Sequence, residues 1–270
     1  MILISGATGT IGSEVVRQLA DLGVPLRAMS RKGGGLHGVR ADFDDPASLR
    51  RAVDGVDALF LLTAPATATS RHDVAMLDAA RDAGVAKVVK LSAIGTGSTT
   101  ADGRVIGEWH LAGEEAVRAS GAAWTILRPS SFASNVLRLA ADGRLANLTG
   151  DGKQGVVDPR DVAAVAVAAL TADGHAECTY TLTGPELLSV PEQAARLGRL
   201  LGRLVEIVEV SAEHVLGSGV DRSAAEEVAR GTAWVREGHN AVVTDDVERV
   251  LGRPPRRFTD WVRDHLALFD

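Results

Sequence analysis

Short apolar runs alternate with amphipathic segments along the first half of the chain. Residues 2–4 form an apolar run that ends in Ser-Gly, and Ile11, Val15 and Leu19 then share one helical stripe. Further strands are predicted at 24–29, 39–41, 58–62, 87–91 and 123–127, with helices from Pro46, around 74–84 and over 105–120. Buried strands separated by helices are typical of a parallel sheet covered on both faces. The pattern therefore predicts a doubly wound α/β Rossmann fold that binds ligands at the carboxyl edge of its strands.

The pattern becomes less regular after Pro129. Glycines punctuate residues 143–155, and we expect a helix over 161–171, a strand over 179–183 and a helix over 191–201. The remainder is predicted to be mostly helical, with Asp245 and Glu248 forming a capping box. We expect a Rossmann domain over 1–129 and a smaller, mostly helical substrate-binding lobe over 130–270. Elements within about 159–183 could rejoin the main sheet.

Composition narrows the classes of protein to which the chain can belong. The net charge of −6 argues against nucleic-acid binding, and one cysteine, Cys178, cannot form an intramolecular disulfide. The N-terminus lacks a signal-peptide pattern, and no apolar run approaches the ~20 residues of a membrane span. We expect a cytoplasmic protein without a nucleic-acid or membrane partner. The seven scattered histidines predict no metal site, and a homodimer is compatible with the sequence.

The segment Gly6-Ala7-Thr8-Gly9-Thr10-Ile11-Gly12 follows the first strand and opens the first helix. A pyrophosphate needs backbone N–H donors at close range and a helix N-terminus directed at it. In this interpretation Gly6 permits the sharp turn, Gly9 removes a Cβ that would face the phosphates, and Gly12 lets the helix pack closely on the sheet. The loop therefore predicts a dinucleotide site, to which Thr8, Thr10 and Ile11 also contribute.

The end of the second strand bears on the choice between NAD and NADP. An NAD enzyme usually places an acid there for the ribose 2′-hydroxyl, but this chain reads Met29-Ser30-Arg31-Lys32. A hydroxyl and a guanidinium favour a 2′-phosphate, so we expect NADP(H) to be preferred over NAD(H). The alternative is that Arg31 and Lys32 are solvated loop cations.

Asp42 and Phe43 follow the short third strand. The Asp42 carboxylate could accept a hydrogen bond from the adenine amino group while Phe43 packs near the ring. Equally, Asp42, Asp44 and Asp45 could simply cap the next helix. The sequence leaves both interpretations open.

Several segments together resemble the NmrA-like atypical short-chain dehydrogenases. They are GATGTIG (6–12), SRK (30–32), KVVKLSAIG (87–95), SGAAWTILRPSSFASN (120–135), VDPRDVA (157–163) and TLTGPELLS (181–189). The family includes NADPH quinone oxidoreductases, azoreductase-like proteins, isoflavone-reductase relatives and redox-sensing regulators. The resemblance implies cofactor contacts from Leu62, Thr63, Ala64, Pro65 and Ser92. It also implies that Ser130, Phe132 and Asn135 line the substrate side.

The chain departs from ordinary short-chain dehydrogenases in its catalytic residues. Those enzymes use a Tyr-x-x-x-Lys pair, whereas the single tyrosine here, Tyr180, has no lysine four residues later. His110 falls roughly where isoflavone-reductase relatives carry a catalytic lysine, and it is the candidate proton donor. Alternatively, His110 only hydrogen-bonds cofactor or backbone. Lys90 is interpreted as a strand-end or sheet-edge charge rather than a catalytic base.

Three functions follow from these observations. The first is an NADPH-dependent oxidoreductase that transfers hydride to a quinone-like or other conjugated small molecule, which needs little acid catalysis. The second is a non-catalytic NADP(H)-sensing regulator that binds a protein partner. The third is a biosynthetic tailoring reductase or isomerase that acts on one specific intermediate.

Overall fold

The computed structural model describes residues 1–35, 37–63, 69–139, 143–211 and 222–269. The chain divides into two compact units. The first unit comprises residues 1–96, 108–128 and 162–180, and the second comprises residues 97–107, 129–161 and 181–270. Each unit has a hydrophobic core of its own.

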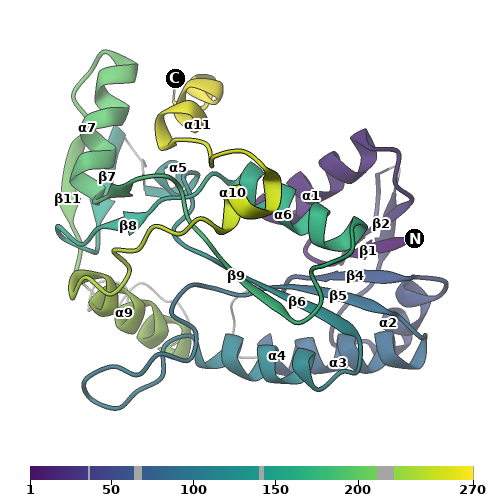
Figure 1. Ribbon diagram of the computed structural model, residues 1–270. Coiled ribbons are helices and arrows are strands. Elements are labelled where there is room, and N and C mark those ends of the chain that lie inside the picture. The colour runs from purple at the N-terminus through teal and green to yellow at the C-terminus, as the bar shows by residue number, and fades with distance from the viewer. Residues whose placement is uncertain (36, 64–68, 140–142, 212–221, 270) are drawn as a thin grey trace. The chain divides into compact units, whose positions relative to one another are not determined.

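A seven-stranded sheet in the order β3-β2-β1-β4-β5-β6-β9 forms the centre of the first unit (Figure 1). Its strands are β1 (Ile2–Ile4), β2 (Leu26–Ser30), β3 (Gly38–Arg40), β4 (Ala58–Leu61), β5 (Lys87–Leu91), β6 (Ala123–Pro129) and β9 (Cys178–Leu182). The neighbouring pairs from β3 to β6 are parallel. β1 and β4 are buried along their whole length, as their unbroken apolar runs predict.

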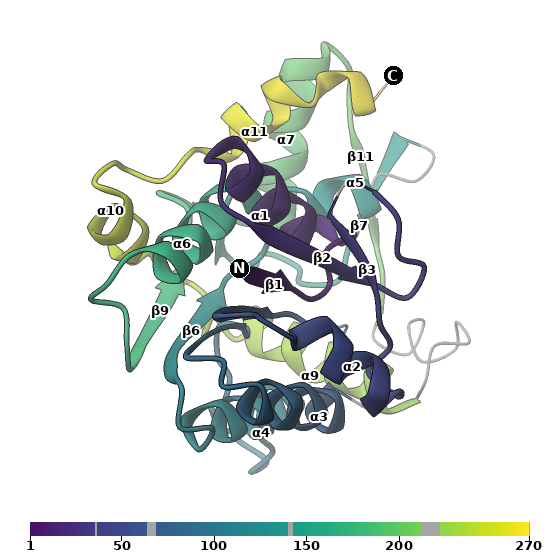
Figure 2. The same cartoon turned by 90° about the vertical axis from the view of Figure 1, so that its right-hand side faces the viewer.

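Helices cover both faces of this sheet. α1 and α6 lie on one face, and α2, α3 and α4 lie side by side on the other (Figures 1 and 2). Their bounds are α1 (Thr10–Asp21), α2 (Pro46–Val53), α3 (Thr69–Asp82), α4 (Glu108–Arg118) and α6 (Pro159–Thr171). This arrangement confirms the doubly wound Rossmann fold, and it brings the strand-to-helix junctions to the carboxyl edge of the sheet.

The second unit combines short strand pairs with helices. β7 (Arg144–Asn147) pairs in parallel with β11 (Glu206–Glu209), and β8 (Gln154–Gly155) pairs antiparallel with β10 (Leu187–Leu188). The helices are α5 (Asn135–Leu139), α7 (Val190–Leu201), α9 (Arg222–Arg236), α10 (Asp246–Leu251) and α11 (Phe258–Asp264), followed by the 3₁₀ helix η2 (Leu266–Leu268). Leu145, Leu197, Phe258 and Trp261 are among the buried side chains that form the core of this unit.

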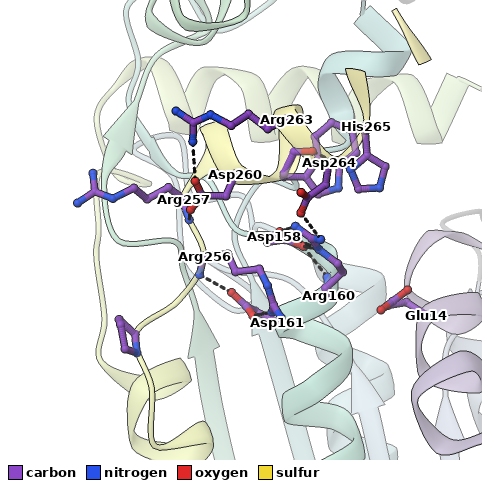
Figure 3. A network of polar contacts seen from close by, with 12 residues as sticks. Glu14, Asp158, Arg160, Asp161, Arg256, Arg257, Asp260, Arg263, Asp264 and His265 are labelled. Carbon is purple, nitrogen blue, oxygen red and sulfur yellow. Dashed lines mark hydrogen bonds and ion pairs between the residues drawn. The ribbon is translucent and has the colours of Figure 1, made fainter. Parts of the chain in front are cut away.

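A network of ion pairs in the second unit joins the VDPRDVA segment to the C-terminal helices (Figure 3). Arg160 contacts Asp158 at 2.7 Å and Asp264 at 2.6 Å. Asp161 is fully buried, and it accepts hydrogen bonds from Arg253 and from both the backbone and the guanidinium of Arg256. The basic 253–257 segment is therefore a turn between α10 and α11 whose charges have partners within the protein.

Two local expectations are wrong. Asp245 precedes α10 but makes no capping hydrogen bond, because its backbone (φ −94°, ψ 2°) is not in the extended conformation that a capping side chain needs. The predicted capping box is thus absent, and the carboxylate of Asp246 instead accepts from the Thr181 backbone N–H at 2.7 Å. Lys90 is not an edge charge: β5 lies between β4 and β6, and the Lys90 side chain is completely buried.

None of the helices in the described ranges is long and apolar enough to cross a membrane.

Candidate functional site

The glycine loop between β1 and α1 is shaped by contacts within its own backbone. Gly6 adopts a left-handed conformation with φ of +62°. A Cβ at Gly12 would collide with the carbonyl oxygen of Gly6 and come within 2.7 Å of its carbonyl carbon. Gly12 thus permits the first helical turn to fold back onto the loop, rather than mainly helping the helix to pack on the sheet.

The first turn of α1 has no cap from a side chain. Gly9 is the N-cap residue and offers no side-chain acceptor, while Thr8, Gly9 and Thr10 are all exposed. The N–H groups that open a helix have no acceptor within the helix itself. The start of α1 therefore presents free N–H donors and the positive end of the helix dipole, which is the arrangement that an anionic diphosphate requires.

Ser5 attaches this loop to the end of β4. Its buried hydroxyl donates to the carbonyl oxygens of Phe60 (3.1 Å) and Leu62 (2.9 Å), and it accepts from the Leu62 N–H at 2.8 Å. The Leu62 side chain lies against Gly6, where an added Cβ would come within 2.8 Å of it. Leu62 thus borders the loop, whereas the predicted contacts Ala64 and Pro65 lie outside the described residues.

Strand register brings a second arginine beside the predicted 2′-phosphate site. Ser30 and Arg40 are direct partners in the parallel β2–β3 pair, and Arg31 follows Ser30. Gly33 turns the chain back with φ of +65°, so that a Cβ there would lie 3.2 Å from the Cβ of Arg40. Within the described chain, the guanidinium groups of Arg31 and Arg40 have no hydrogen-bond or ion-pair partner.

Arg31 and Arg40, together with Arg51, are among the residues that line a hollow of about 620 Å³. Carboxylates also line it, but they have other partners. Asp45 caps α2 by accepting from the N–H groups of Ala47 and Ser48, and Asp44 accepts from Arg71 at 2.7 Å. Asp42 lines it as well, and Arg51 lies 4.0 Å from Asp45. Arg31 and Arg40 are thus the two arginines of this hollow without an ion-pair partner in the described chain, and a phosphate monoester could bind them.

The 42–45 segment has more than one role. The Asp42 carboxylate accepts from the backbone N–H of Asp44 at 3.1 Å, in the turn that leads to the Asp45 cap. The Phe43 ring stacks on His72, with ring centroids 5.2 Å apart. An adenine contact from Asp42 or Phe43 stays a prediction.

Two polar atoms at the start of α4 are buried without a hydrogen-bond partner among the described residues. They are Nε1 of Trp109 and Nδ1 of His110, whose rings meet edge to face with centroids 5.9 Å apart. An unsatisfied buried donor or acceptor is costly, and such atoms commonly mark a place that a ligand completes. Burial, followed by the positive charge of Lys90, lowers the pKa of His110 to about 4, so its imidazole is uncharged at neutral pH.

Glu114, one helical turn after His110, connects three elements of the first unit. Its buried carboxylate accepts from Ser92 (2.6 Å), from Arg128 in a two-pronged contact (2.9 and 2.6 Å) and from Arg118 (3.0 Å). Burial alone would raise the pKa of Glu114, but the hydrogen bonds from Arg128 and Ser92 outweigh it and the pKa is lowered. The Ser92 hydroxyl hydrogen is thus used internally, and only its lone pairs are available to a cofactor.

A second buried contact involves Thr63, another predicted cofactor residue. Its hydroxyl donates to Asp73 at 3.0 Å, and the other oxygen of Asp73 accepts from Lys90 at 2.6 Å. Thr63 therefore helps to hold a fully buried ion pair.

The predicted substrate-side residues lie in the second unit. Ser130 donates to Asn240 at 3.2 Å, and the Asn135 amide donates to Ser131 at 3.2 Å. Phe132 is half-buried and forms an isolated bridge with Val157. Their contact with a substrate stays a prediction.

Sequence reasoning missed Ser5, Arg40, Asp73 and Glu114. The i, i+4 spacing of His110 and Glu114 could have suggested a shared helix face. Arg40 could have been found by placing the two predicted strands in parallel register. Within the described part of the chain, no cluster of His, Cys, Asp and Glu side chains could hold a metal ion.

Comparisons with known proteins agree with this geometry. A sequence profile for NAD(P)H-binding proteins matches residues 6–173. A (4-alkanoyl-5-oxo-2,5-dihydrofuran-3-yl)methyl phosphate reductase from Streptomyces griseus is 40% identical over 283 residues, covering 100% of this chain and 99% of the relative. An NAD(P)H azoreductase from Xenophilus azovorans is 36% identical over 286 residues, covering 100% and 99%.

Solved structures share the fold. The crystal structure of an NADPH-dependent quinone oxidoreductase from Escherichia coli, complexed with NADPH, matches with a TM-score of 0.82 at 24% identity, covering 98% of this chain and 100% of the other. The Citrobacter sp. triphenylmethane reductase complexed with NADP(H) matches with a TM-score of 0.75 at 23% identity, covering 98% and 99%. The chain therefore belongs to the NAD(P)H-binding family of NmrA-like atypical short-chain dehydrogenases and is an NAD(P)H-dependent oxidoreductase.

Proposed function

We propose that the protein is an NADPH-dependent reductase that transfers hydride to a conjugated carbonyl compound, such as an enone, a butenolide or a quinone. The observation that carries this proposal is the electrostatic state of His110. The candidate acid on α4 is uncharged at neutral pH, and no Tyr-x-x-x-Lys pair accompanies it. An acceptor that is already electrophilic suits such a site because its reduction needs little help from an acid.

The preference for NADPH rests on the unpaired guanidinium groups of Arg31 and Arg40. Beside Ser30 they border a hollow in which a 2′-phosphate could accept charge-assisted hydrogen bonds from them. Lys32 follows on the exposed loop and adds to the local positive charge. At the first helix, the uncapped N–H groups after Gly9 would hold the diphosphate.

NADPH, when bound, supplies the hydride. The conjugated acceptor takes this hydride at its electrophilic carbon, and its π electron pair moves onto the carbonyl oxygen. An uncharged His110 can donate an N–H hydrogen bond to that oxygen but is a weak acid, so the proton that completes the reduction comes from water. His110 acts here as an oxyanion-stabilising donor, and we propose Ser130, Phe132 and Asn135 as contacts on the substrate side.

A biosynthetic tailoring role is a more specific version of this function. It is favoured by the Streptomyces griseus relative, whose name describes the reduction of an alkanoyl-dihydrofuranone methyl phosphate. That compound combines a conjugated carbonyl with a phosphate ester. We therefore place such butenolide phosphates beside quinones in the set of acceptors to be tested.

The test is NADPH oxidation by the purified protein with a simple quinone, an azo dye, an enone and the butenolide phosphate. We expect turnover with at least one conjugated acceptor and a higher kcat/KM for NADPH than for NADH. Turnover of none of these acceptors by folded protein would contradict the proposal. Binding that differs between NADP⁺ and NADPH, without turnover, would instead favour a sensing role.

A further inference from the structure

A fully buried ion pair lies between α3 and β5, and the reaction described above does not use it. Lys90 of β5 and Asp73 of α3 are both 0% exposed, and Nζ of Lys90 lies 2.6 Å from Oδ2 of Asp73. Two charges removed from water rarely stabilise a protein more than well-packed apolar side chains do. The pair is therefore better explained by what its geometry holds in place than by stability.

The pair is attached to the end of β4 through one hydrogen bond. The hydroxyl of Thr63 donates to Oδ1 of Asp73 at 3.0 Å, while Oδ2 of the same carboxylate binds Lys90. Thr63 is 3% exposed and follows shortly after β4 ends at Leu61. Gly113 of α4 leaves room for this arrangement, because a Cβ there would collide with Asp73 and lie 2.8 Å from Cε of Lys90. Segments of β4, α3, β5 and α4 thus meet at one buried carboxylate.

The end of β4 borders the crevice in which a Rossmann fold binds its nucleotide. β1 and β4 are neighbours in the sheet, with β2 and β3 on one side of them and β5 and β6 on the other. The strand order reverses between β1 and β4, and such sheets bind ligands beyond the carboxyl ends of the strands at that point. Thr63 therefore lies where the shape of the backbone decides how a nucleotide fits.

Two side chains hold the end of β4. Ser5, at the end of β1, accepts from the N–H of Leu62 at 2.8 Å and donates to the carbonyl oxygen of Leu62 at 2.9 Å. Asp73 holds the next residue, Thr63, by its hydroxyl. The hydroxyl hydrogen of Thr63 is thus already used within the protein, so Thr63 can serve a nucleotide by placing the backbone rather than by donating to it.

We propose that the Lys90–Asp73 pair is a positioning device that fixes the carboxyl end of β4 in the shape required by the nicotinamide half of the nucleotide. The glycine loop and the β2–β3 end belong to one mononucleotide-binding half of the fold, and β4 and β5 belong to the other. Lys90 keeps Asp73 in place, Asp73 holds Thr63, and neither charged group touches the nucleotide. A crevice that is ordered in advance loses less conformational entropy on binding. The inference rests on nucleotide binding and holds whichever acceptor is reduced.

The test removes the hydrogen bond of Thr63 and leaves the shape of the side chain nearly unchanged. Thr63→Val loses the hydroxyl, whereas Thr63→Ser keeps it. We expect Thr63→Val to weaken NADPH binding by about fivefold and Thr63→Ser to bind NADPH with native affinity. Adenosine 2′,5′-bisphosphate, which lacks the nicotinamide half, should bind both variants as it binds the native protein. Isothermal titration calorimetry with the two ligands measures this without any turnover.

Thr125→Val is the matched control. Thr125 of β6 is 1% exposed, and its hydroxyl donates to the carbonyl oxygen of His175 at 2.7 Å. This change also removes a buried hydroxyl hydrogen bond, but in the half of β6 that lies toward its amino end. We expect it to lower the free energy of unfolding and to leave the affinity for NADPH native. Equal losses of NADPH affinity in the two valine variants would reduce Thr63 to a structural residue.

A second comparison determines whether Thr63 acts through the pair. Lys90→Met combined with Asp73→Leu removes both charges and the acceptor of the Thr63 hydrogen bond, and we expect it to weaken NADPH binding by about fivefold as well. Adding Thr63→Val to this double variant should cause no further loss, because groups that act as one unit are not additive. In the free protein, hydrogen exchange at the Leu62 amide should be faster in Thr63→Val than in the native chain.

Native NADPH affinity in Thr63→Val, or an equal loss of NADPH and adenosine 2′,5′-bisphosphate, would overturn the positioning role. A full additional loss in the triple variant would overturn it too, because Thr63 would then act independently of the pair. Should the Lys90 and Asp73 double variant not fold, unchanged exchange at Leu62 in Thr63→Val decides against the proposal instead. None of these results bears on the acceptor assay with the native enzyme, in which the proposed reduction succeeds or fails by itself.

Discussion

Two polar regions of the molecule look equally conspicuous in sequence but differ in how their polar groups are used. The glycine loop and the adjoining β2–β3 end present uncapped helix N–H groups and two unpaired guanidinium groups, Arg31 and Arg40. In the VDPRDVA network, Asp158, Arg160 and Asp161 each bind partners within the second unit (Figure 3). The first region has polar groups available for a ligand, whereas the charged groups of the second region form ion pairs with each other.

The difference shows how a binding site can be told from a structural network. The groups of the first region are exposed to solvent and have no partner in the described chain, so an anionic ligand could bind them without breaking an internal contact. Arg253 and Arg256 show the converse case, because their guanidinium groups already bind the buried carboxylate of Asp161. Substitutions in the first region should therefore change binding, and substitutions in the second should change stability.

The largest expected effect is that of Gly12→Ala. The new Cβ would collide with the Gly6 carbonyl, so the loop must open and its N–H groups must lose their alignment. We expect the affinities for NADPH and NADH to fall together by about 100-fold, or about 2.7 kcal/mol. Isothermal titration calorimetry of both nucleotides measures this loss.

Gly231→Ala is the matched control for that substitution. Gly231 lies in α9, and a Cβ there would meet nothing within 4 Å. If the Gly12→Ala variant bound nucleotides with native affinity, the loop would tolerate the side chain. The contrast between a binding region and a structural network would then fail.

Next in size is the effect of Asp161→Asn. The amide keeps the shape of the side chain but replaces a buried carboxylate that binds two arginines, so part of the charge-assisted hydrogen bonding is lost. We expect the free energy of unfolding to fall by about 2 kcal/mol, with the Kd for NADPH unchanged. Urea denaturation and calorimetry together check this, and a weakened Kd in folded protein would give the network a role in binding.

A smaller and more selective effect is expected from Arg31→Ala and Arg40→Ala. Each removes one guanidinium from the hollow, so each should weaken NADPH binding by about tenfold, or about 1.4 kcal/mol, and leave NADH binding unchanged. Arg50→Ala, on the exposed side of α2, is the control. Equal losses for NADPH and NADH would refute a contact with the 2′-phosphate.

The fold could be predicted from the sequence because apolar runs such as β1 and β4 are each followed by a helix whose apolar residues recur with helical spacing. The runs at 58–62 and 87–91 correspond to β4 and β5 with differences of at most one residue. Helix starts were harder to place: α4 begins at Glu108, three residues later than predicted. Short-range patterns place a helix stripe well but do not fix the residue at which the first turn forms.

The site could be predicted where backbone conformation determines it, and not where buried charges do. The loop 6–12 can be recognised from the spacing of its glycines, because these residues lie close together in the sequence. Lys90 and Asp73 are separated by 17 positions, and their pairing depends on α3 packing beside α4 over β5. Lys90 was expected at a sheet edge because charged side chains usually lie at the surface. The residues that flank Lys90 in the sequence do not indicate that a buried carboxylate pairs with it.

The contact of Gly12 with Gly6 has a consequence for how fast a nucleotide can associate. A loop held by its own backbone and by the Ser5 hydroxyl is ordered before any ligand arrives. Association then loses little conformational entropy, so its rate should follow solvent viscosity and ionic strength rather than a slow rearrangement.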